Sequence, residues 1–283
     1  MKQQANDLFT RQVHHLEKVY PIGEARKMVF WLFEDILNVS NGKILANAWI
    51  EPGREQLEEL DHAVFRLLGH EPIQHVLGKV VFYGHAFIVN RHVLIPRQET
   101  EELVDLIRKE IKQESPAILD IGTGSGIIPI CLKLALPAAE VYGWDVSKEV
   151  LETARENAER LGASVHFEKQ DILKSIPDER KYDLIVSNPP YVLESEKEEM
   201  SPNVLAFDPH LALFVPDNTP LLFYESITAF AGTHLKAGGK LYFEINERFG
   251  AEVAALMQVK GFSEVQVIKD LNGKDRMVRG IYE

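Results

Sequence analysis

Hydrophobic residues in the first 78 positions recur at the three- and four-residue spacing of amphipathic helices. Three stretches show this spacing: Leu8, Val13 and Leu16; Val29, Leu32, Phe33, Ile36 and Leu37; and Leu57, Leu60, Val64, Leu67 and Leu68. The helix-breaking sequences are Pro21-Ile22-Gly23, Asn41-Gly42 and Glu51-Pro52-Gly53. The pattern predicts a small all-helical domain over residues 1–78.

The pattern changes after this region. From Val80 to Asn90 most residues are β-branched or aromatic, and they lie on either side of Gly84. Such a run around a glycine is typical of a β-hairpin. We expect residues 79–98 to form a β-hairpin linker between two domains.

Short apolar runs alternate with helical stretches from residue 99 to residue 283. The runs are Ala117 to Ile121, Glu140 to Trp144, Val165 to Phe167, Leu184 to Val186 and Lys240 to Ile245. Strands that alternate with helices predict an α/β domain with a mostly parallel sheet covered on both faces. Asn272-Gly273 separates two final runs, Val265 to Ile268 and Met277 to Tyr282, which we expect to form a closing hairpin.

The composition is that of an ordinary soluble globular protein. Among 283 residues, 45% are hydrophobic and 26% are charged. The N-terminal residues lack the apolar core of a secretory signal, and no apolar run approaches the roughly 18 residues of a membrane span. Cys131 is the single cysteine, so an internal disulfide is excluded, and its apolar surroundings predict simple packing. We therefore expect a cytoplasmic protein with no membrane partner.

Charge argues against nucleic acid as the partner. The net charge is −12, whereas phosphate binding draws much of its affinity from Lys and Arg. The acidic clusters at residues 99–102 and 194–199 are the densest charge features, and an acidic surface suits a protein partner better. A metal site is not expected, because His14 and His15 are adjacent and His70 and His75 lack nearby thiolates.

A glycine-rich sequence follows the first run of the α/β region. Ala117 to Ile121 leads directly into Gly122-Thr123-Gly124-Ser125-Gly126, and a helical run comes next. In a parallel sheet this turn lies at the carboxyl end of its strand, where ligands bind and where Gly lets the backbone approach them closely. A nicotinamide dinucleotide site would need a small residue in place of Ile127, so the sequence disfavours that cofactor.

Two acidic residues follow the next predicted strands. Asp145 stands nineteen residues beyond Gly126, where a carboxylate can accept hydrogen bonds from ribose hydroxyls. It could instead cap the following helix, but Ser147 can do that alone. Asp171 follows the third strand and could accept from an adenine amino group, although an Asp is also common in loops.

The fourth strand ends in the tetrapeptide Asn188-Pro189-Pro190-Tyr191. Its prolines fix φ and remove two backbone donors, so the segment is rigid and presents carbonyl acceptors. The Asn188 side-chain oxygen and one proline carbonyl could accept both hydrogens of an NH₂ group, with Tyr191 packed on its planar face. Such acceptors would align an amide nitrogen, a poor nucleophile, and stabilise the charge that develops on it. We predict that Asn188, Pro189 and Tyr191 are catalytic and that Asn188, Pro189, Pro190 and Tyr191 bind substrate.

The glycine-rich segment, with Asp145 and Asp171, resembles the cofactor-binding pattern of the Rossmann-like class I S-adenosylmethionine methyltransferases. The tetrapeptide resembles both enzymes that methylate nucleic-acid bases and enzymes that methylate glutamine side chains. Three upstream segments look like the peptide chain release factor glutamine methyltransferase family, also called HemK or PrmC: Glu71 to Gly78, Phe82-Tyr83-Gly84 and Val93 to Thr100. With the helical N-terminal region, this resemblance covers nearly the whole chain.

The resemblance implies a reaction and a partner. A methyl group would pass from S-adenosylmethionine to the side-chain amide nitrogen of the Gln in the Gly-Gly-Gln motif of class 1 release factors. Alternatives are a glutamine methyltransferase acting on a ribosomal protein and, more distantly, a nucleic-acid methyltransferase. The helical domain would recognise the release factor, and we expect a monomer. A cofactor-binding protein without catalysis is a further hypothesis, against which the intact Asn188 and Tyr191 argue.

The resemblance also assigns residues to the cofactor. They are Asn188 near the methyl donor, Arg97, Glu99 and Thr100 beside the methionine end, Asp171 and Ile172 toward adenine, and Gly122, Thr123, Gly124, Ser125, Gly126 and Asp145. Glu99 could equally serve the first turn of a helix, which favours acids. Ile172 stands where many family members have an aromatic residue, and Asp208 stands where the family's substrate segment has Glu.

Overall fold

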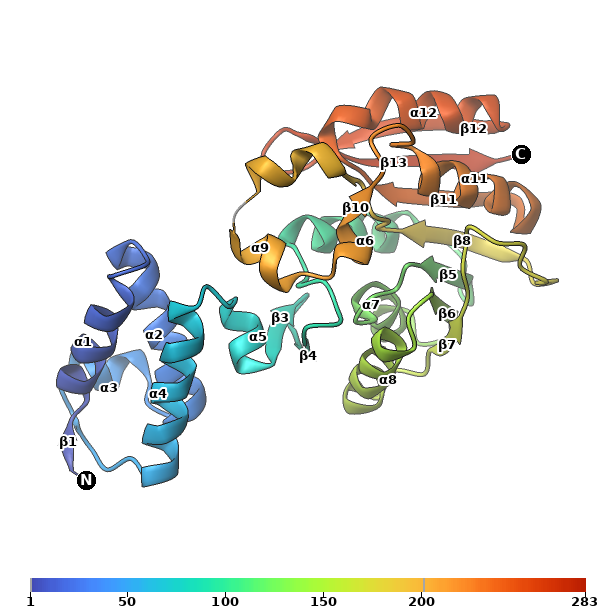
Figure 1. Cartoon of the computed structure of the whole chain (residues 1–283). Coiled ribbons are helices and arrows are strands. Elements are labelled where there is room, and N and C mark those ends of the chain that lie inside the picture. Colours follow the sequence, from blue (N-terminus) through green and yellow to red (C-terminus); the bar gives the residue numbers. More distant parts are fainter. Residues whose placement is uncertain (1, 201) are drawn as a thin grey trace. The chain divides into compact units, whose positions relative to one another are not determined.

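Residues 2–200 and 202–283 are described by the computed structural model, and their contacts divide them into two units (Figure 1). The first unit holds the residues up to Gly78 together with the short segment that ends at Phe207. The second holds Lys79–Met200 and Asp208–Glu283. Within the described ranges, no helix is both long and apolar enough to cross a membrane.

Helices make up most of the first unit. They are α1 (Ala5–Leu16), α2 (Ile22–Ile36), α3 (Asn41–Leu45), α4 (Arg54–Leu68), α5 (Ile73–Leu77) and α9 (Pro202–Phe207). The apolar faces predicted for these helices meet in one core, where Leu8 of α1, Leu32 of α2 and Leu60 of α4 are buried together. The predicted helical character of this region is therefore confirmed.

Two details of the first unit differ from the sequence pattern. Asn41-Gly42 was expected only as a break between helices, but it begins the short helix α3. Burial of Ile44 in the core stabilises this helix. A short strand, β1 (Gln3–Gln4), pairs antiparallel with β2 (Trp49–Ile50). Strands of two residues are too short to show the alternation on which a strand prediction depends.

A β-hairpin begins the second unit. β3 (Lys79–Phe82) and β4 (His85–Ile88) pair antiparallel around a two-residue turn with φ angles of 49° and 79°, the left-handed values that such a turn requires. Asn157 holds the hairpin, since its side chain accepts from the Ile88 N–H at 2.6 Å and donates to the Ile88 carbonyl at 3.0 Å. The predicted hairpin is confirmed, and it is anchored within the second unit.

Seven strands form the sheet of the second unit. From one edge to the other they are β12 (Phe262–Lys269), β13 (Asp275–Tyr282), β11 (Leu235–Glu244), β8 (Tyr182–Ser187), β5 (Ala117–Ile121), β6 (Glu140–Asp145) and β7 (His166–Lys169). The five strands from β11 to β7 pair in parallel, and β13 is antiparallel to both of its neighbours. All seven predicted runs overlap these strands, and the last two form the expected hairpin.

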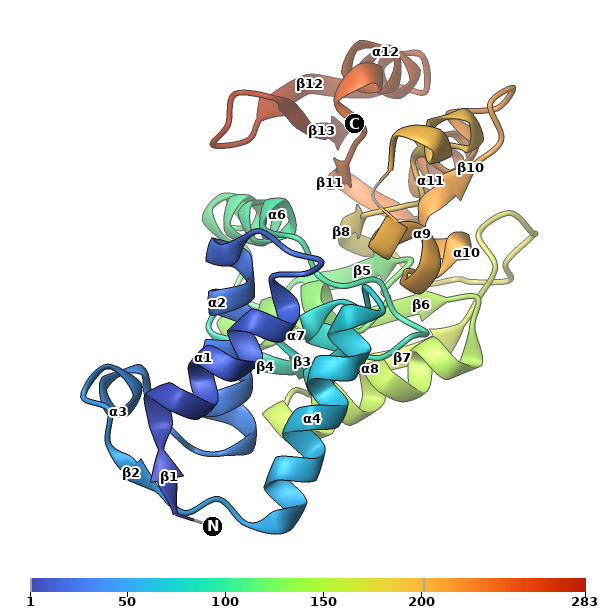
Figure 2. The same ribbon diagram turned by 60° about the vertical axis from the view of Figure 1, so that its left-hand side comes forward.

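Helices cover both faces of this sheet (Figures 1 and 2). α6 (Gln98–Glu110), α7 (Ile127–Ala135) and α8 (Lys148–Leu161) pack on one face, and α11 (Leu222–His234) and α12 (Gly250–Val259) pack on the other. Alternate β5 side chains serve the two cores, because Ile118 faces the first set of helices and Leu119 faces the second. The predicted α/β architecture is therefore confirmed.

Short elements complete the second unit: β9 (Val192–Leu193), η1 (Glu194–Glu199), α10 (His210–Leu213), β10 (Phe214–Val215) and η2 (Glu247–Phe249). Cys131 is buried on α7, where burial raises the pKa of its thiol to about 12. A thiol so rarely ionised near neutral pH fits the predicted packing role.

The chain leaves the centre of the sheet in two directions. From β5 it proceeds to β6 and β7 on one side, whereas β8, on the other side of β5, leads to β11. The neighbouring strands β5 and β8 therefore form a topological switch point, and open α/β sheets bind ligands at the carboxyl ends of strands there. Gly122, Asp145 and Asn188 all lie at this edge.

Candidate active site

A cavity of about 450 Å³ lies at the carboxyl ends of β5, β6 and β8. It is lined by most of the residues predicted to hold a cofactor: Arg97, Thr100, Gly122, Thr123, Gly124, Ser125, Asp145, Asp171, Ile172 and Asn188. Its walls also include apolar side chains that the sequence patterns did not single out, among them Leu173, Phe223 and Ile227. A largely apolar cavity of this size with a few polar groups is typical of a small-molecule site.

Backbone hydrogen bonds hold the glycine-rich loop in place. The N–H groups of Gly122 and Thr123 both donate to the Trp144 carbonyl at 2.9 Å. Gly126 has a φ of 81°, and a Cβ added there would lie 2.9 Å from the Ile130 side chain. Gly126 therefore packs closely against α7 and is not among the residues that line the cavity.

Asn157 connects the loop to the hairpin. Besides holding Ile88, its side-chain nitrogen donates to the Ser125 carbonyl at 2.9 Å. Asn157 is buried on α8 among apolar neighbours. No sequence motif pointed to Asn157, although a polar side chain on the apolar face of a helix was a usable signal.

Asp145 ends β6 with its carboxylate turned toward the glycine-rich loop. Oδ2 accepts from the Gly124 N–H and Oδ1 from the Ser147 N–H, each at 3.1 Å. Burial raises the pKa of Asp145, and these backbone donors oppose that shift. Ser147 caps α8 by accepting from the Val150 N–H at 3.3 Å, as predicted. Asp145 is thus available to a ligand, and its contact with a ribose stays a prediction.

Asp171 and Ile172 line the cavity beyond β7. The carboxylate of Asp171 pairs with Lys174 at 2.9 Å, and this hydrogen bond lowers the pKa of Asp171. The half-buried Ile172 packs on the apolar cluster that also includes Phe223. The proposed adenine contacts of both residues remain predictions.

The tetrapeptide forms the edge between two hollows. Asn188 and Pro189 line both the large cavity and a small adjoining pocket. Pro190 lines the large cavity, and Tyr191 lines the small pocket. Groups bound on either side would therefore meet at Asn188 and Pro189.

A buried carboxylate lies next to the tetrapeptide. Glu244, the last residue of β11, is fully buried and accepts from the Thr100 hydroxyl at 2.7 Å and from the Tyr191 hydroxyl at 3.2 Å. The side-chain nitrogen of Asn188 donates to Thr100 Oγ1 at 3.4 Å. Burial raises the pKa of Glu244, and the Thr100 hydrogen bond opposes the shift. No sequence motif pointed to Glu244, although it is the single acidic residue of β11.

Arg97 and Thr100 reach the cavity, whereas Glu99 is not among its lining residues. Arg97 also lines the small pocket. Glu99 lies in the first turn of α6, and its charge acts on Glu102 and Arg276. The geometry therefore favours the helix-start interpretation of Glu99 over a cofactor contact.

Asp208 precedes a segment that contributes Pro209 and Ala212 to the cavity wall. The side chain is buried, and burial raises its pKa to about 6, with the charge of Arg97 opposing the shift. These facts assign it no chemical role. Among the residues that the structure describes, no group of three or more His, Cys, Asp and Glu could hold a metal ion.

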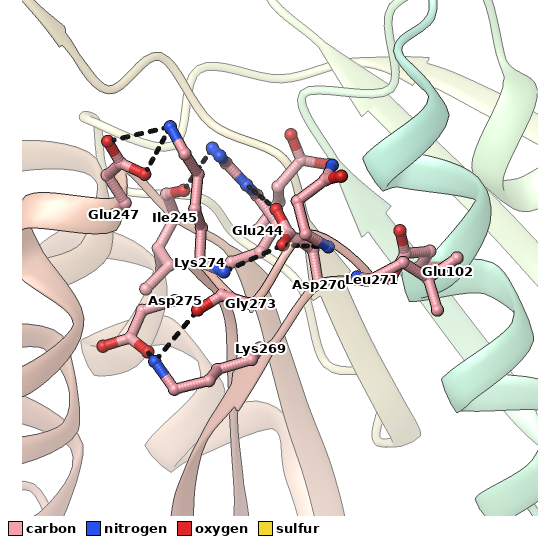
Figure 3. A network of polar contacts seen from close by, with 12 residues as sticks. Glu102, Glu244, Ile245, Glu247, Lys269, Asp270, Leu271, Gly273, Lys274 and Asp275 are labelled. Carbon is pink, nitrogen blue, oxygen red and sulfur yellow. Dashed lines mark hydrogen bonds and ion pairs between the residues drawn. The ribbon is translucent and has the colours of Figure 1, made fainter.

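A polar cluster ties the turn between β12 and β13 to α6 (Figure 3). Asp270 accepts from backbone N–H groups of the turn at 2.9 Å and from the Arg276 side chain at 3.3 Å. The Leu271 N–H donates to the Glu102 carboxylate at 3.1 Å. Glu102 lies two residues beyond Thr100, so the turn supports the helix end that borders the cavity.

Two family models match the chain. Residues 98–206 match the methyltransferase small domain, and residues 7–78 match the PrmC N-terminal domain. The crystal structure of a methyltransferase from Pyrococcus furiosus is similar with a TM-score of 0.53 at 19% identity, over 78% of this chain and 98% of that one. This likeness supports the fold alone.

Curated relatives cover nearly the whole chain. A release factor glutamine methyltransferase from Bacteroides thetaiotaomicron is 45% identical over 264 residues, which are 93% of this chain and 95% of the relative. One from Flavobacterium psychrophilum is 39% identical over 274 residues, 95% of this chain and 96% of the relative. Identity at this level over both regions shows that the chain belongs to the release factor glutamine methyltransferase family.

Proposed function

We propose that this protein transfers the methyl group of S-adenosylmethionine to the side-chain amide nitrogen of the Gln in the Gly-Gly-Gln motif of class 1 release factors. The observation that carries the proposal is the position of Asn188 and Pro189 on the edge shared by the large cavity and the small pocket. A donor in the cavity and a planar amide that approaches from the side of Tyr191 would meet there. Membership of the family supports the choice of glutamine over a nucleic-acid base.

The cavity suits S-adenosylmethionine. Asp145 offers carboxylate lone pairs to the ribose hydroxyls, and the apolar side chains of Ile172 and Phe223 offer a surface to adenine. Arg97 and Thr100 line the same cavity as Asn188, the residue proposed to lie near the methyl donor. When bound, S-adenosylmethionine supplies an electrophilic methyl group on a positively charged sulfur.

The chain's own residues orient the nucleophile. The Asn188 side-chain oxygen and a proline carbonyl accept the two amide hydrogens, which places the nitrogen for in-line attack. As the new bond to carbon forms, positive charge grows on the nitrogen, and the same acceptors stabilise it. The face of Tyr191 adds a cation–π contribution of about 1 kcal/mol. No covalent enzyme intermediate is needed, because the nitrogen–carbon bond would form as the carbon–sulfur bond breaks. S-adenosylhomocysteine would leave, and the methylated nitrogen would lose one of its hydrogens as a proton.

Each part of the chain has its own role in the proposed function. Residues 1–78 form the release factor recognition domain, residues 79–98 the hairpin that follows it, and residues 99–283 the catalytic domain. The protein acts as a monomer in the cytoplasm and has no direct nucleic-acid target. The match of residues 7–78 to a domain model of the same family supports the first assignment.

Transfer of tritium from labelled S-adenosylmethionine tests the function directly. The wild-type protein should label a purified class 1 release factor, and the label should disappear when the target Gln is replaced by Ala. Labelling of ribosomal proteins with an inert release factor would favour the ribosomal alternative. Labelling of RNA or DNA alone would refute a glutamine substrate.

A variant of Asn188 separates catalysis from cofactor binding. Asn188→Ala should lower kcat by about 100-fold or more, because it removes one acceptor for the developing charge. The Kd of S-adenosylmethionine should change by less than about threefold. Asn218→Ala, at an exposed loop position, is the matched control. A wild-type protein that binds the cofactor but labels no substrate would favour the binding-only hypothesis.

A further inference from the structure

We propose that Glu244 is a positioning residue that fixes the orientation of the Asn188 side-chain amide through the hydroxyl group of Thr100. The inference rests on the proposed role of Asn188 as acceptor for the substrate amide, and it extends that role to residues outside the tetrapeptide. Catalysis requires the Asn188 oxygen to face the substrate. The oxygen and the NH₂ group of an Asn have similar size, so packing alone does not select this orientation.

Two hydroxyl groups converge on the Glu244 carboxylate. Thr100 Oγ1 lies 2.7 Å from Oε2, and the Tyr191 hydroxyl lies 3.2 Å from Oε1. An ionised carboxylate only accepts hydrogen bonds, and a hydroxyl group has one hydrogen to donate. Thr100 and Tyr191 therefore both direct their only hydroxyl hydrogen to Glu244.

The orientation of Asn188 follows from this count of donors. Thr100 Oγ1 lies 3.4 Å from the Asn188 side-chain nitrogen. With its hydrogen directed to Glu244, Thr100 can only accept from Asn188, so the NH₂ group must face it. A reversed amide would bring two acceptors together at Thr100 and would turn an NH₂ group toward the NH₂ group of the substrate. Glu244 thus selects the orientation in which the Asn188 oxygen remains available.

Burial and the nearby positive charges act in opposite directions on the ionised form of Glu244 that this arrangement needs, and burial has the larger effect on the pKa. Arg97 and Arg276 both act on the carboxylate with positive charge. Arg276 itself donates a hydrogen bond to the Asp270 carboxylate at 3.3 Å. Burial acts in the opposite direction and raises the pKa of Glu244. The positioning effect should therefore weaken when Glu244 takes up a proton in acid.

Thr100 offers a matched pair of variants for the test. Thr100→Val replaces the hydroxyl with a methyl group of similar size, and Thr100→Ser keeps the hydroxyl. Thr100→Val should lower kcat for release factor methylation by about 10- to 100-fold when measured at saturating S-adenosylmethionine, so that a change in cofactor affinity does not enter the comparison. Thr100→Ser should recover most of the lost kcat. Thr153→Val on α8 controls for a purely structural loss, because it removes a buried threonine hydroxyl that also donates one hydrogen bond and accepts another, outside the cavity lining.

A second variant tests the carboxylate itself. Glu244→Gln keeps the volume but can donate as well as accept, so it no longer forces Thr100 to donate. Its kcat should fall by a similar factor. Combining it with Thr100→Val should reduce kcat no further than the more damaging single change, because both break the same chain of hydrogen bonds.

The possible outcomes separate this inference from the proposed function. Equal kcat values for Thr100→Val and Thr153→Val, or fully additive losses in the double variant, would overturn the positioning role. So would a collapse of turnover in Asn188→Ala while Glu244→Gln stays active. A wild-type protein that leaves the release factor unmethylated would instead overturn the proposed function.

Discussion

The backbone N–H of Gly124 donates a hydrogen bond to Oδ2 of Asp145 at 3.1 Å, which joins the glycine-rich loop after β5 to the end of β6. The other oxygen of Asp145 is held by the Ser147 N–H, also at 3.1 Å. The carboxylate is therefore oriented before a ligand enters. Such preorganisation reduces the entropy that binding must overcome.

Replacing Asp145 should weaken cofactor binding. Asp145→Ala removes the carboxylate and should raise the Kd of S-adenosylmethionine by about 10- to 100-fold, the range expected for hydrogen bonds to a charged group. Asp145→Asn keeps one acceptor oxygen, so its Kd should lie between those of the wild-type protein and Asp145→Ala. Isothermal titration calorimetry measures all three, with Asp217→Ala as a control at an exposed carboxylate. An unchanged Kd for Asp145→Ala would mean that this carboxylate serves only the loop.

Ile172 provides a test of the adenine-binding wall. Ile172→Ala removes three carbon atoms from a half-buried apolar surface and should raise the Kd of S-adenosylmethionine about tenfold. Ile172→Phe should bind at least as tightly as wild type, because an aromatic ring can stack on adenine. The exposed Val259→Ala on α12 is the control. Equal affinities for Ile172→Ala and wild type would place adenine elsewhere.

The sequence predicted the fold well because its signals are local. Helical spacing around Leu32, alternating runs such as Ala117 to Ile121, and the Asn272-Gly273 turn each report the conformation of neighbouring residues. Only very short elements, such as β1 and α3, were not predicted from the sequence. Tertiary burial of Ile44 and pairing with β2 stabilise those two, and neither effect is visible in a local window.

The candidate site was only partly predictable. Motifs located the glycine-rich loop, Asp145 and Asn188, all of which the structure brings to one cavity. Glu244 escaped because its partner Thr100 lies 144 positions away in the sequence, and only the fold brings them together. Glu99 was assigned to the cofactor through a motif, but it lies in the first turn of α6 and is not among the residues that line the cavity.

Substitutions at two glycines with left-handed backbone angles can distinguish the cost of backbone strain from the cost of a steric clash. Gly126 has a φ of 81° and would place a Cβ 2.9 Å from Ile130, whereas Gly162 has a φ of 68° and open space around it. Gly162→Ala should cost about 1 kcal/mol of unfolding free energy, the penalty for the backbone alone. Gly126→Ala should cost a further 1 to 3 kcal/mol, roughly the penalty for overpacking. Urea unfolding of both variants measures the difference, and equal losses would contradict the predicted contact.

Asp120 on β5 is a fully buried carboxyl group directly before the glycine-rich loop. Burial raises its pKa from 3.8 to about 7, with the Thr123 hydroxyl opposing the shift and the charge of Asp145 adding to it. The folded state therefore holds this proton more tightly than the unfolded state. The resulting stabilisation is fully present below about pH 4 and is lost as pH rises through about 7.

Asp120→Asn should remove this contribution, because Asn has a similar shape and does not ionise. Between pH 5 and pH 8 the wild-type protein should lose about 2 to 3 kcal/mol of unfolding free energy relative to the variant, since about two pKa units of the shift lie in that window. Urea unfolding of both proteins across this pH range measures the difference and cancels the titration of other groups, including Asp208. Parallel stability curves would mean that Asp120 ionises in the folded protein as it does in the unfolded chain. A wild-type curve that falls more steeply toward pH 8 would show that the folded protein holds a proton on Asp120, next to the glycine-rich loop.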